Sequence, residues 1–440
     1  MTTIATDALT AQAVEELANR HGEPDWLRAR RREAWRLFEE APMPSPLDEE
    51  WKRTDADKLT LDGLLPFAPE HPAVDDPAAL PPGLAPDAEE RLAGRLVQLD
   101  SSTVHRGLDE ALAGQGVVFT DLHTAAREHE AIVRERLGSL VTPAEWKYLG
   151  LEAALWSGGA FIYVPQGVEV ELPLEYVVGL ATERLGVFPH LLVVAEANSK
   201  VTVVQGGISS TLEGLNVVAG AVEIVAGDGA QVRFVDVQRW GRNVQDFVTM
   251  RATLGRSASL QAILLGLGGA ITKSRLDVRL ANEGANAKLL GLFFGDSDQH
   301  FDYDTRQDHI APRTESDLLF KSTLTDHAAL VWNGVVEVQK SASQSSANQT
   351  SRNLLLSDKA SASPTPILEI SAYDVTKCSH GATVGPVDEE QRFYLQSRGI
   401  PADEAERMLV EGFFAEVLER VPSEALQRRV HAVLASKLGW

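Results

Sequence analysis

The sequence predicts a mainly β protein, with a β-helix (solenoid) core and helical domains on both sides of it. Three observations predict this fold. Short β-branched runs follow one another from about residue 146 without intervening helical patterns. A turn followed by a small residue recurs at residues 199, 230, 258, 285, 328 and 360, at intervals of 31, 28, 27, 43 and 32 residues. Amphipathic helical patterns precede and follow this region.

Length and charge narrow the class of protein. A chain of 440 residues exceeds the usual size of one core, so we expect two or three structural units or one elongated repeat. Its 63 acidic and 41 basic residues give a formal net charge of -22, which repels nucleic acid and anionic lipid. No apolar stretch reaches about 18 residues, the length that a membrane span needs. We therefore expect neither nucleic-acid nor membrane partners.

The N-terminus and the cysteine content predict a reducing compartment. Residues 1–21 lack the basic and apolar regions of a secretory signal. Cys378 is the only cysteine, so the chain cannot form an internal disulfide bond. It also cannot build a zinc or iron-sulfur site from its own thiolates alone. We expect a cytoplasmic protein.

Residues 1–140 are predicted to form an N-terminal helical domain. Apolar residues follow a helical spacing from 10 to 18 and from 26 to 38. Seven of the 21 prolines fall between residues 66 and 86, which predicts an extended linker because proline fixes φ and lacks a backbone donor. Helical patterning resumes at about 87 to 137.

Residues 141–385 are predicted to form the solenoid core. Alternating runs occupy residues 160–165, 168–172, 191–194, 217–225 and 232–237, and each coil would bury its inward side chains against the next. An ordinary β-sandwich with recurring turns is the alternative. The segment 341–350 is rich in Ser, Asn and Gln, and we favour ordered side-chain ladders over low-complexity disorder there.

Residues 386–440 are predicted to form a C-terminal helical domain. Asp388 and Gln391 have capping-box-like spacing, and residues 398–401 stop one helix and start the next. Val410, Phe414 and neighbouring apolar residues extend round the second helix. So broad an apolar surface favours a second contact, with complete burial inside the chain as the alternative.

Searches for catalytic motifs mostly fail. Residues 268–274 are similar to a phosphate loop, but Thr272 replaces the glycine that close approach to phosphate requires. His300, Asp302 and Asp304 would share one strand face, with Asp308 and His309 following, and could hold a divalent metal ion. A hydrogen-bonded strand face is the favoured alternative. The chain does not resemble a self-contained enzyme.

Cys378 and His380 form the second candidate group. In an extended segment the two side chains point to the same side, which brings one thiol and one imidazole close together. A purely structural pair is the ordinary interpretation of such residues. Two ligands cannot complete a four-coordinate site, so a functional version would share its metal with a second chain.

Several blocks resemble the SufB/SufD family, the scaffold subunits of the SUF iron-sulfur cluster assembly system. Residues 377–385 and 388–400 are similar to the family's C-terminal signature, and residues 49–54, 154–165 and 351–357 resemble further blocks. Together they span about residues 45–420. The resemblance implies a right-handed parallel β-helix between two helical domains.

The resemblance also implies partners and site residues. Such scaffolds pair with a sister SufB-like scaffold through the β-helix and bind a SufC-like ABC-type ATPase on their C-terminal helices. The implied ATPase docking residues are Phe393, Tyr394, Val410 and Phe414. The implied cargo is a transient iron-sulfur cluster, shared with the partner scaffold and delivered to apo acceptor proteins, and no cluster is expected on the isolated chain.

Two departures from the SufB pattern favour a SufD-type member. Ala360 stands where SufB-type members typically carry a thiol, and His380 stands where they carry Glu. The resemblance therefore makes His380 the first candidate cluster or metal ligand and Cys378 the second, in a non-catalytic scaffold. A homodimer of the isolated chain stays open. A carbohydrate-active β-helix enzyme and a purely structural solenoid are the alternatives.

Overall fold

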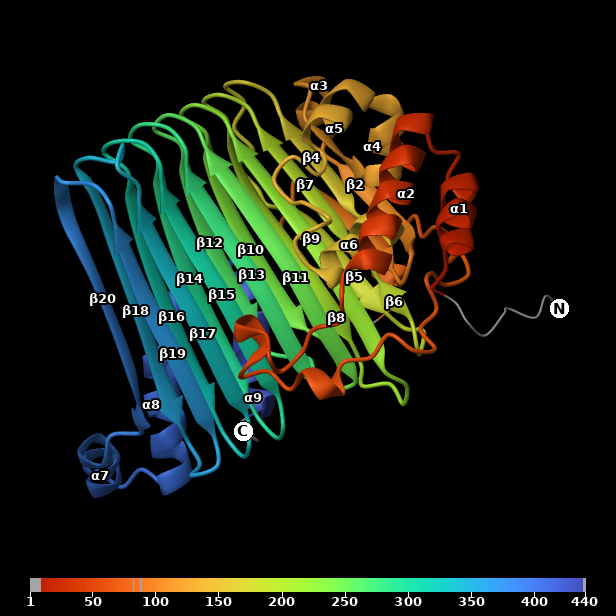
Figure 1. Ribbon diagram of the computed structural model, residues 1–440. Coiled ribbons are helices and arrows are strands. Elements are labelled where there is room, and N and C mark those ends of the chain that lie inside the picture. Colours follow the sequence, from red (N-terminus) through yellow and green to blue (C-terminus); the bar gives the residue numbers. More distant parts are fainter. Residues whose placement is uncertain (1–8, 82, 88, 438–440) are drawn as a thin grey trace.

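The computed structural model describes residues 9–81, 83–87 and 89–437. Outside these residues lie 1–8, which belong to the stretch without a secretory pattern, Pro82 of the predicted linker, Ala88 and the last three residues of the predicted C-terminal domain. Two long sheets form the facing walls of a parallel β-solenoid of about eight turns, with helices at the N- and C-terminal ends (Figure 1). This confirms the predicted fold class.

From His190 onward, successive strands alternate between the two sheets. The first sheet has the order β2 (Ser102–Leu108), β1 (Gly94–Leu99), β5 (Leu174–Leu180), β8 (Lys200–Ser209), β10 (Gln231–Arg239), β12 (Ser259–Gly266), β14 (Asn286–Gly295), β16 (Glu315–Leu324), β18 (Ser345–Leu355) and β20 (Val375–Pro386). The second has the order β19 (Ser361–Ile370), β17 (Ala329–Val338), β15 (His300–His309), β13 (Ile271–Leu280), β11 (Val244–Leu254), β9 (Asn216–Ala226), β7 (His190–Ala195), β4 (Ala160–Val164) and β3 (Val118–Asp121), with β6 (Gly186–Val187) beside β9. Only β1 with β2 and β3 with β4 pair antiparallel among these strands. Parallel pairing of the other strands excludes the β-sandwich alternative, which is antiparallel.

The recurring turn of the sequence is a corner of the solenoid. Asn198 and Gly229 have φ values of 58° and 70°, and the residues that follow them, Ser199 and Ala230, are only 1% and 0% exposed. A left-handed residue turns the chain, and a small side chain fits the inside of the bend. The small residues at 199, 230, 258 and 285 lie at corners before strands of the first sheet, whereas Ala328 lies at a corner before β17 of the second sheet. The interval of 43 residues results from this change of sheet.

The N-terminal region combines helices with strands. Its helices are α1 (Ala11–Arg20), α2 (Asp25–Glu40), α3 (Glu110–Gly114), α4 (Leu122–Glu128) and α5 (Glu130–Arg136), with short 3-10 turns η1 (Glu49–Trp51), η2 (Ala56–Lys58) and η3 (Pro77–Ala79). The helical pattern predicted over 87–137 is therefore wrong for β1, β2 and β3, which extend the two sheets. α6 (Lys147–Leu155) is a helix inside the region predicted to be all strand.

The proline-rich segment packs against the solenoid. Leu80 and Leu84 are buried among Val97, Val104 and Val177 of the first sheet. It is thus largely without regular secondary structure, as the prolines predict, but it is not a free linker. The division into three domains at residues 140 and 385 stays a prediction.

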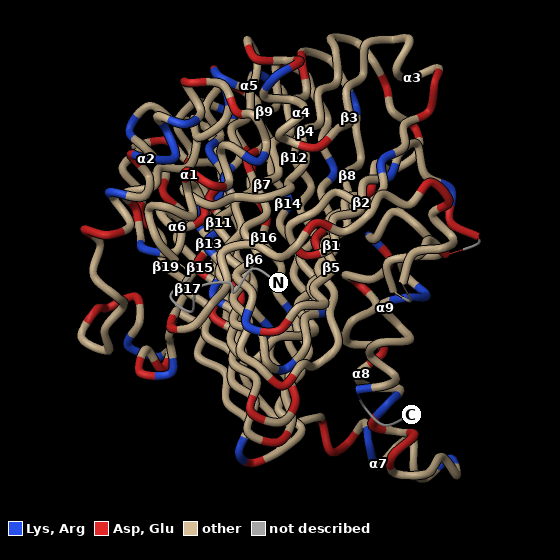
Figure 2. Tube along the Cα trace, turned by 90° about the vertical axis from the view of Figure 1, so that its right-hand side faces the viewer, with Lys and Arg blue, Asp and Glu red and all other residues tan. Residues whose placement is uncertain are grey.

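Among the residues described, the three largest apolar clusters hold the main elements together. One fills the space between the two sheets, which we call the lumen, and is built from inward side chains such as Val232 and Phe234. Another packs α1, α2 and α6 on the outer face of the second sheet. On the opposite side, α8 (Ala402–Leu418) and α9 (Glu424–Lys437) cover the outer face of the first sheet (Figure 2). None of the helices described is both long and apolar enough to cross a membrane.

Candidate functional site

Cys378 and His380 lie on the last strand of the first sheet. β20 pairs with β18, with Cys378 opposite Ala347 and His380 opposite Gln349. Both partner residues are buried and face the lumen. Since side chains in register share a face, Cys378 and His380 point to the same side of β20, as the sequence predicted.

Side chains in register on successive strands of the first sheet form a row that faces the lumen. This row is buried in the earlier coils and becomes exposed at His380, in the last coil. Leu289, Leu318 and Gln349 precede His380 in this row and are each 0% exposed, whereas His380 is exposed. Cys378 is half-buried, and burial raises the pKa of its thiol. In this environment the thiol is protonated and weakly reactive, and the imidazole is the accessible group.

Cys378 and His380 lie at an uncovered end of the solenoid. β20 and β19 are the outermost strands of their sheets, so each has one unpaired edge (Figure 1). Val384 on β20 and Ile370 on β19 face the lumen side and are 43% and 44% exposed. These two apolar side chains on the lumen face are therefore open to a partner here.

The two open edges differ in their backbone donors. The backbone N–H of Ser361 donates to Ala328, just before β17, and that of Ser371 donates to Val338 at the end of β17. The even-numbered residues between them therefore turn their backbone groups to the free edge. Pro364 and Pro366 occupy such positions and carry no N–H, which is a common protection of edge strands. β20 contains no proline before its final residue. It is therefore the better edge for strand pairing.

The serine- and asparagine-rich segment leads into this end of the solenoid and is ordered. Its residues 345–350 belong to β18. Asn348 donates to Asp317 of β16 (2.9 Å) and accepts from Ser379 of β20 (2.8 Å). This side-chain ladder across three coils matches the expectation of order and fixes β20 on the face opposite to His380.

The four implied ATPase docking residues separate into two pairs. Phe393 and Tyr394 lie on α7 (Glu389–Ser397), which projects beyond the last strands, and are 71% and 57% exposed (Figure 1). Val410 and Phe414 on α8 are 1% and 0% exposed and pack on the outer face of the first sheet. The structure thus corrects the docking expectation for Val410 and Phe414, because their apolar side chains complete the core.

The predicted cap at Asp388 is present, with bonds from the backbone N–H groups of residues 390 and 391.

In the group of His300, Asp302 and Asp304, the two carboxylates form ion pairs with a lysine. Lys273 Nζ lies 2.9 Å from Asp302 Oδ2 and 2.9 Å from Asp304 Oδ2, and its side chain is fully buried. Thr54 also donates to Asp302 and lies 2.9 Å from His300 Nε2. Burial lowers the pKa of His300 to about 4, so this imidazole is neutral. The favoured hydrogen-bonded strand face is what the structure shows.

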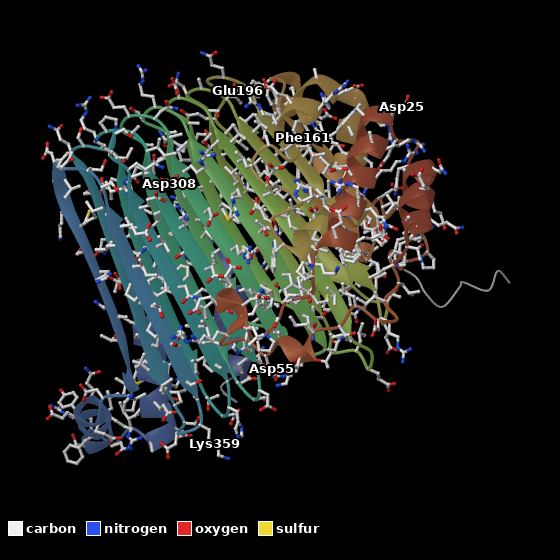
Figure 3. The ribbon with its side chains drawn as sticks, in the orientation of Figure 1. Asp25, Asp55, Phe161, Glu196, Asp308 and Lys359 are labelled. Carbon is white, nitrogen blue, oxygen red and sulfur yellow. The ribbon has the colours of Figure 1, made fainter. Side chains whose placement is uncertain are left out.

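The remaining acid and histidine of this motif are also engaged. Asp308, near the end of β15 (Figure 3), accepts a bond of 2.8 Å from Gln339, and His309 lies 2.8 Å from the hydroxyls of Thr314 and Ser316. Within the described parts of the chain, no three His, Cys, Asp or Glu residues are placed to hold a metal ion.

Sequence reasoning missed the segment that covers this lysine. The segment after α2 crosses the outer face of the second sheet (Figure 1), where Trp51 packs among Trp146, Tyr148 and Phe247. Lys273 Nζ lies 5.3 Å from the Trp51 ring. The only signal in the sequence was the block at 49–54, which resembles a family motif but does not itself disclose its contact with β13 and β15.

Comparisons with known proteins identify the family of the chain. Residues 178–413 match the family model described as SUF system FeS cluster assembly, SufBD core domain. The iron-sulfur cluster assembly protein SufD of Bacillus subtilis is 34% identical over 97% of both chains. SufB of the same organism is 30% identical over 94% of this chain and 90% of its own length. A SufBD family protein of Staphylococcus epidermidis is 30% identical with the same coverage.

Fold and site define a parallel β-solenoid protein with one uncovered end and a cysteine-histidine pair on its terminal strand. The chain belongs to the SufB/SufD family of iron-sulfur cluster assembly proteins of the SUF system. The resemblance found in the sequence is confirmed, and the higher identity to SufD than to SufB of Bacillus subtilis is consistent with a SufD-type member.

Proposed function

We propose that this chain is a non-catalytic, cytoplasmic scaffold that pairs with a SufB-like sister scaffold through the open end of its solenoid. One observation carries the proposal: β20 combines an unpaired edge with an exposed imidazole and exposed apolar side chains that belong to the lumen face. A partner sheet that pairs with β20 would continue the solenoid and cover this face. His380 and Cys378 would then lie at the junction of the two scaffolds.

The ligand set supports a shared assembly site. An iron-sulfur cluster is normally held by about four thiolates, sometimes with histidines in their place. This chain offers one thiol and one imidazole on the junction strand, so the partner would supply the remaining ligands. The cluster is the cargo of the site, and apo acceptor proteins would receive it.

The exposure of side chains on α7 supports an ATPase docking surface on this helix. No side chain of α7 is buried, and Phe393 and Tyr394 are exposed on it. Exposed aromatic side chains are frequent anchors of protein interfaces. We assign contact with a SufC-like ATPase to these two residues, while Val410 and Phe414 hold α8 against the solenoid.

Paired variants test the scaffold junction. Val384→Asp places a charge on the lumen face of β20, and the adjacent Thr383→Asp places the same charge on the opposite face. Co-purification with the sister scaffold should fall at least tenfold for Val384→Asp and stay near wild type for Thr383→Asp, because a charge buried without a partner is costly. Equal capture by both folded variants would contradict pairing through this face.

A second pair of variants tests the docking surface. Phe393→Asp should abolish capture of the ATPase without changing the helical circular dichroism signal, because Phe393 is exposed. Glu390→Gln, on the same helix, is the control and should keep capture. If Phe393→Asp binds the ATPase as the wild type does, α7 is not the docking surface.

A further inference from the structure

A small cavity lies on the outer face of the first sheet, on the side that α9 covers (Figure 2). Its volume is about 20 Å³, which is room for about one particle of the size of a water molecule. The proline-rich segment, the strands β5, β8 and β10 and the helix α9 all contribute to its lining. The lining combines apolar side chains with three charged ones, those of Glu175, Arg239 and Arg429.

Positive charge exceeds negative charge around this cavity. Glu175 pairs with Arg95 at 2.6 Å and with Arg429 at 3.1 Å. Arg429 also lies 3.1 Å from Glu90, and Arg239 adds a third guanidinium. Burial and the charge of Glu175 raise the pKa of Glu90, so the group holds at most two negative charges. Because arginine keeps its proton in proteins, the group carries an excess of at least one positive charge.

Arg239 supplies the excess charge and can be reached from the cavity. Among the side chains that the structure describes, its guanidinium has no hydrogen-bond or ion-pair partner. The side chain is only half-buried and lines the cavity, so its N–H groups are open to a particle held there. Burial and the charge of Arg429 lower the pKa of Arg239 more than Glu175 raises it, so no carboxylate compensates this cation. An anionic partner would therefore stabilise it.

We propose that this cavity binds one chloride ion between Arg239 and Arg429. The cavity has room for about one monatomic ion, whereas phosphate is too large for it. Arg429 is 21% exposed and forms its ion pairs through Nη2, so Nη1 is left to donate to the anion. The chain's net charge of -22 opposes the ion only weakly, because physiological salt screens charges beyond about 8 Å. The ion would join α9 to β10, and the proposal does not depend on the scaffold function.

Amide hydrogen exchange across α9 in the full chain tests the proposal, with chloride varied against gluconate at constant ionic strength. Exchange should slow saturably, by about tenfold at about 150 mM chloride for a dissociation constant of about 15 mM, because the ion binds only the docked helix. Line broadening of the ³⁵Cl resonance by the protein measures binding itself. Arg239→Gln should remove both effects. Arg233→Gln, at an exposed position of the same strand outside the cavity lining, is the control and should keep them.

A second variant fills the cavity without removing a charge. Gly206 lines the cavity, and a Cβ built on it would meet only Val177, at 3.8 Å, so Gly206→Ala should fold. Its methyl group would take the space of the ion and should abolish the chloride dependence although both arginines stay. The absence of chloride dependence in the wild type would overturn the proposal. So would its persistence in folded Arg239→Gln or Gly206→Ala, or its loss in Arg233→Gln.

Discussion

Two aspartates in the lumen make the stability of this protein depend on pH. Asp246 of β11 is 2% exposed and stands in register with Val218 and Thr272 on the neighbouring strands. Burial raises its pKa to about 8, and it raises the pKa of Asp236 on β10 to about 7. At neutral pH, Asp246 is therefore protonated in the folded chain and ionised in the unfolded chain.

The sign and size of the effect follow from proton linkage. The folded chain binds the proton more tightly than the unfolded chain, so stability falls as pH rises from about 4 to about 8. At pH 7 the unfolded side chain, with a pKa of 3.8, is about three units past its midpoint. At about 1.4 kcal/mol per unit, the buried acid costs about 4 kcal/mol.

Asp246→Asn removes this cost because the amide has the shape of the neutral acid and does not ionise when the chain unfolds. We expect the variant to be more stable than the wild type by up to about 4 kcal/mol at pH 7, with the difference vanishing near pH 4. Urea unfolding followed by tryptophan fluorescence at several pH values measures this difference. Asp298→Asn is the control, since the Asp298 side chain is 93% exposed. An unchanged pH slope in Asp246→Asn, or a variant less stable than wild type at pH 8, would show that the buried Asp246 is not the source of this pH dependence.

Three further outcomes follow from the packing and from the site. Phe414→Ala empties a fully buried position and should weaken the docking of α8 on the solenoid by about 3–5 kcal/mol, seen as faster amide exchange across α8 with slow exchange kept in the sheets. Lys273→Met leaves Asp302 buried without its cation and should lower the free energy of unfolding by about 3–5 kcal/mol in denaturant titrations. In a reconstituted complex of equal ATPase content, His380→Ala should lower cluster delivery to an apo acceptor well below wild type, and Cys378→Ser should have the milder effect. Wild-type delivery by His380→Ala would leave His380 as a structural residue only.

The repeat in the sequence predicted the solenoid, and the parallel pairing of the strands excluded the β-sandwich that the repeat alone had left open. Corners such as those before Ser199 and Ala230 impose both a left-handed residue and a small buried one, so each coil leaves a local mark. The strands β1 to β3 could not be predicted in the same way. Leu96 and Val97 are buried on opposite faces of β1, so the strand shows no alternation and its pairing with β5 depends on residues about 80 positions away.

The candidate site was predictable only in part. Local alternation placed Cys378 and His380 on one side of a strand, but the exposure of that side depends on which coil is the last. The sequence could not show whether the broad apolar surface of α8 contacts a partner protein or the solenoid of the same chain. In the structure, Phe414 packs on strands of the first sheet. The acids after His300 were visible as a cluster, whereas Lys273, which contacts both Asp302 and Asp304, lies on the neighbouring strand and one coil earlier.

In the proposed function, the open end of the solenoid provides half of a shared assembly site. Anaerobic reconstitution of the isolated chain with iron and sulfide, followed by desalting and measurement of iron per chain, tests it most directly. We expect little retained iron on the chain alone and a retained cluster when the SufB-like scaffold is added, with the gain lost in Val384→Asp and kept in Thr383→Asp. A stable, stoichiometric cluster on the isolated chain would contradict it.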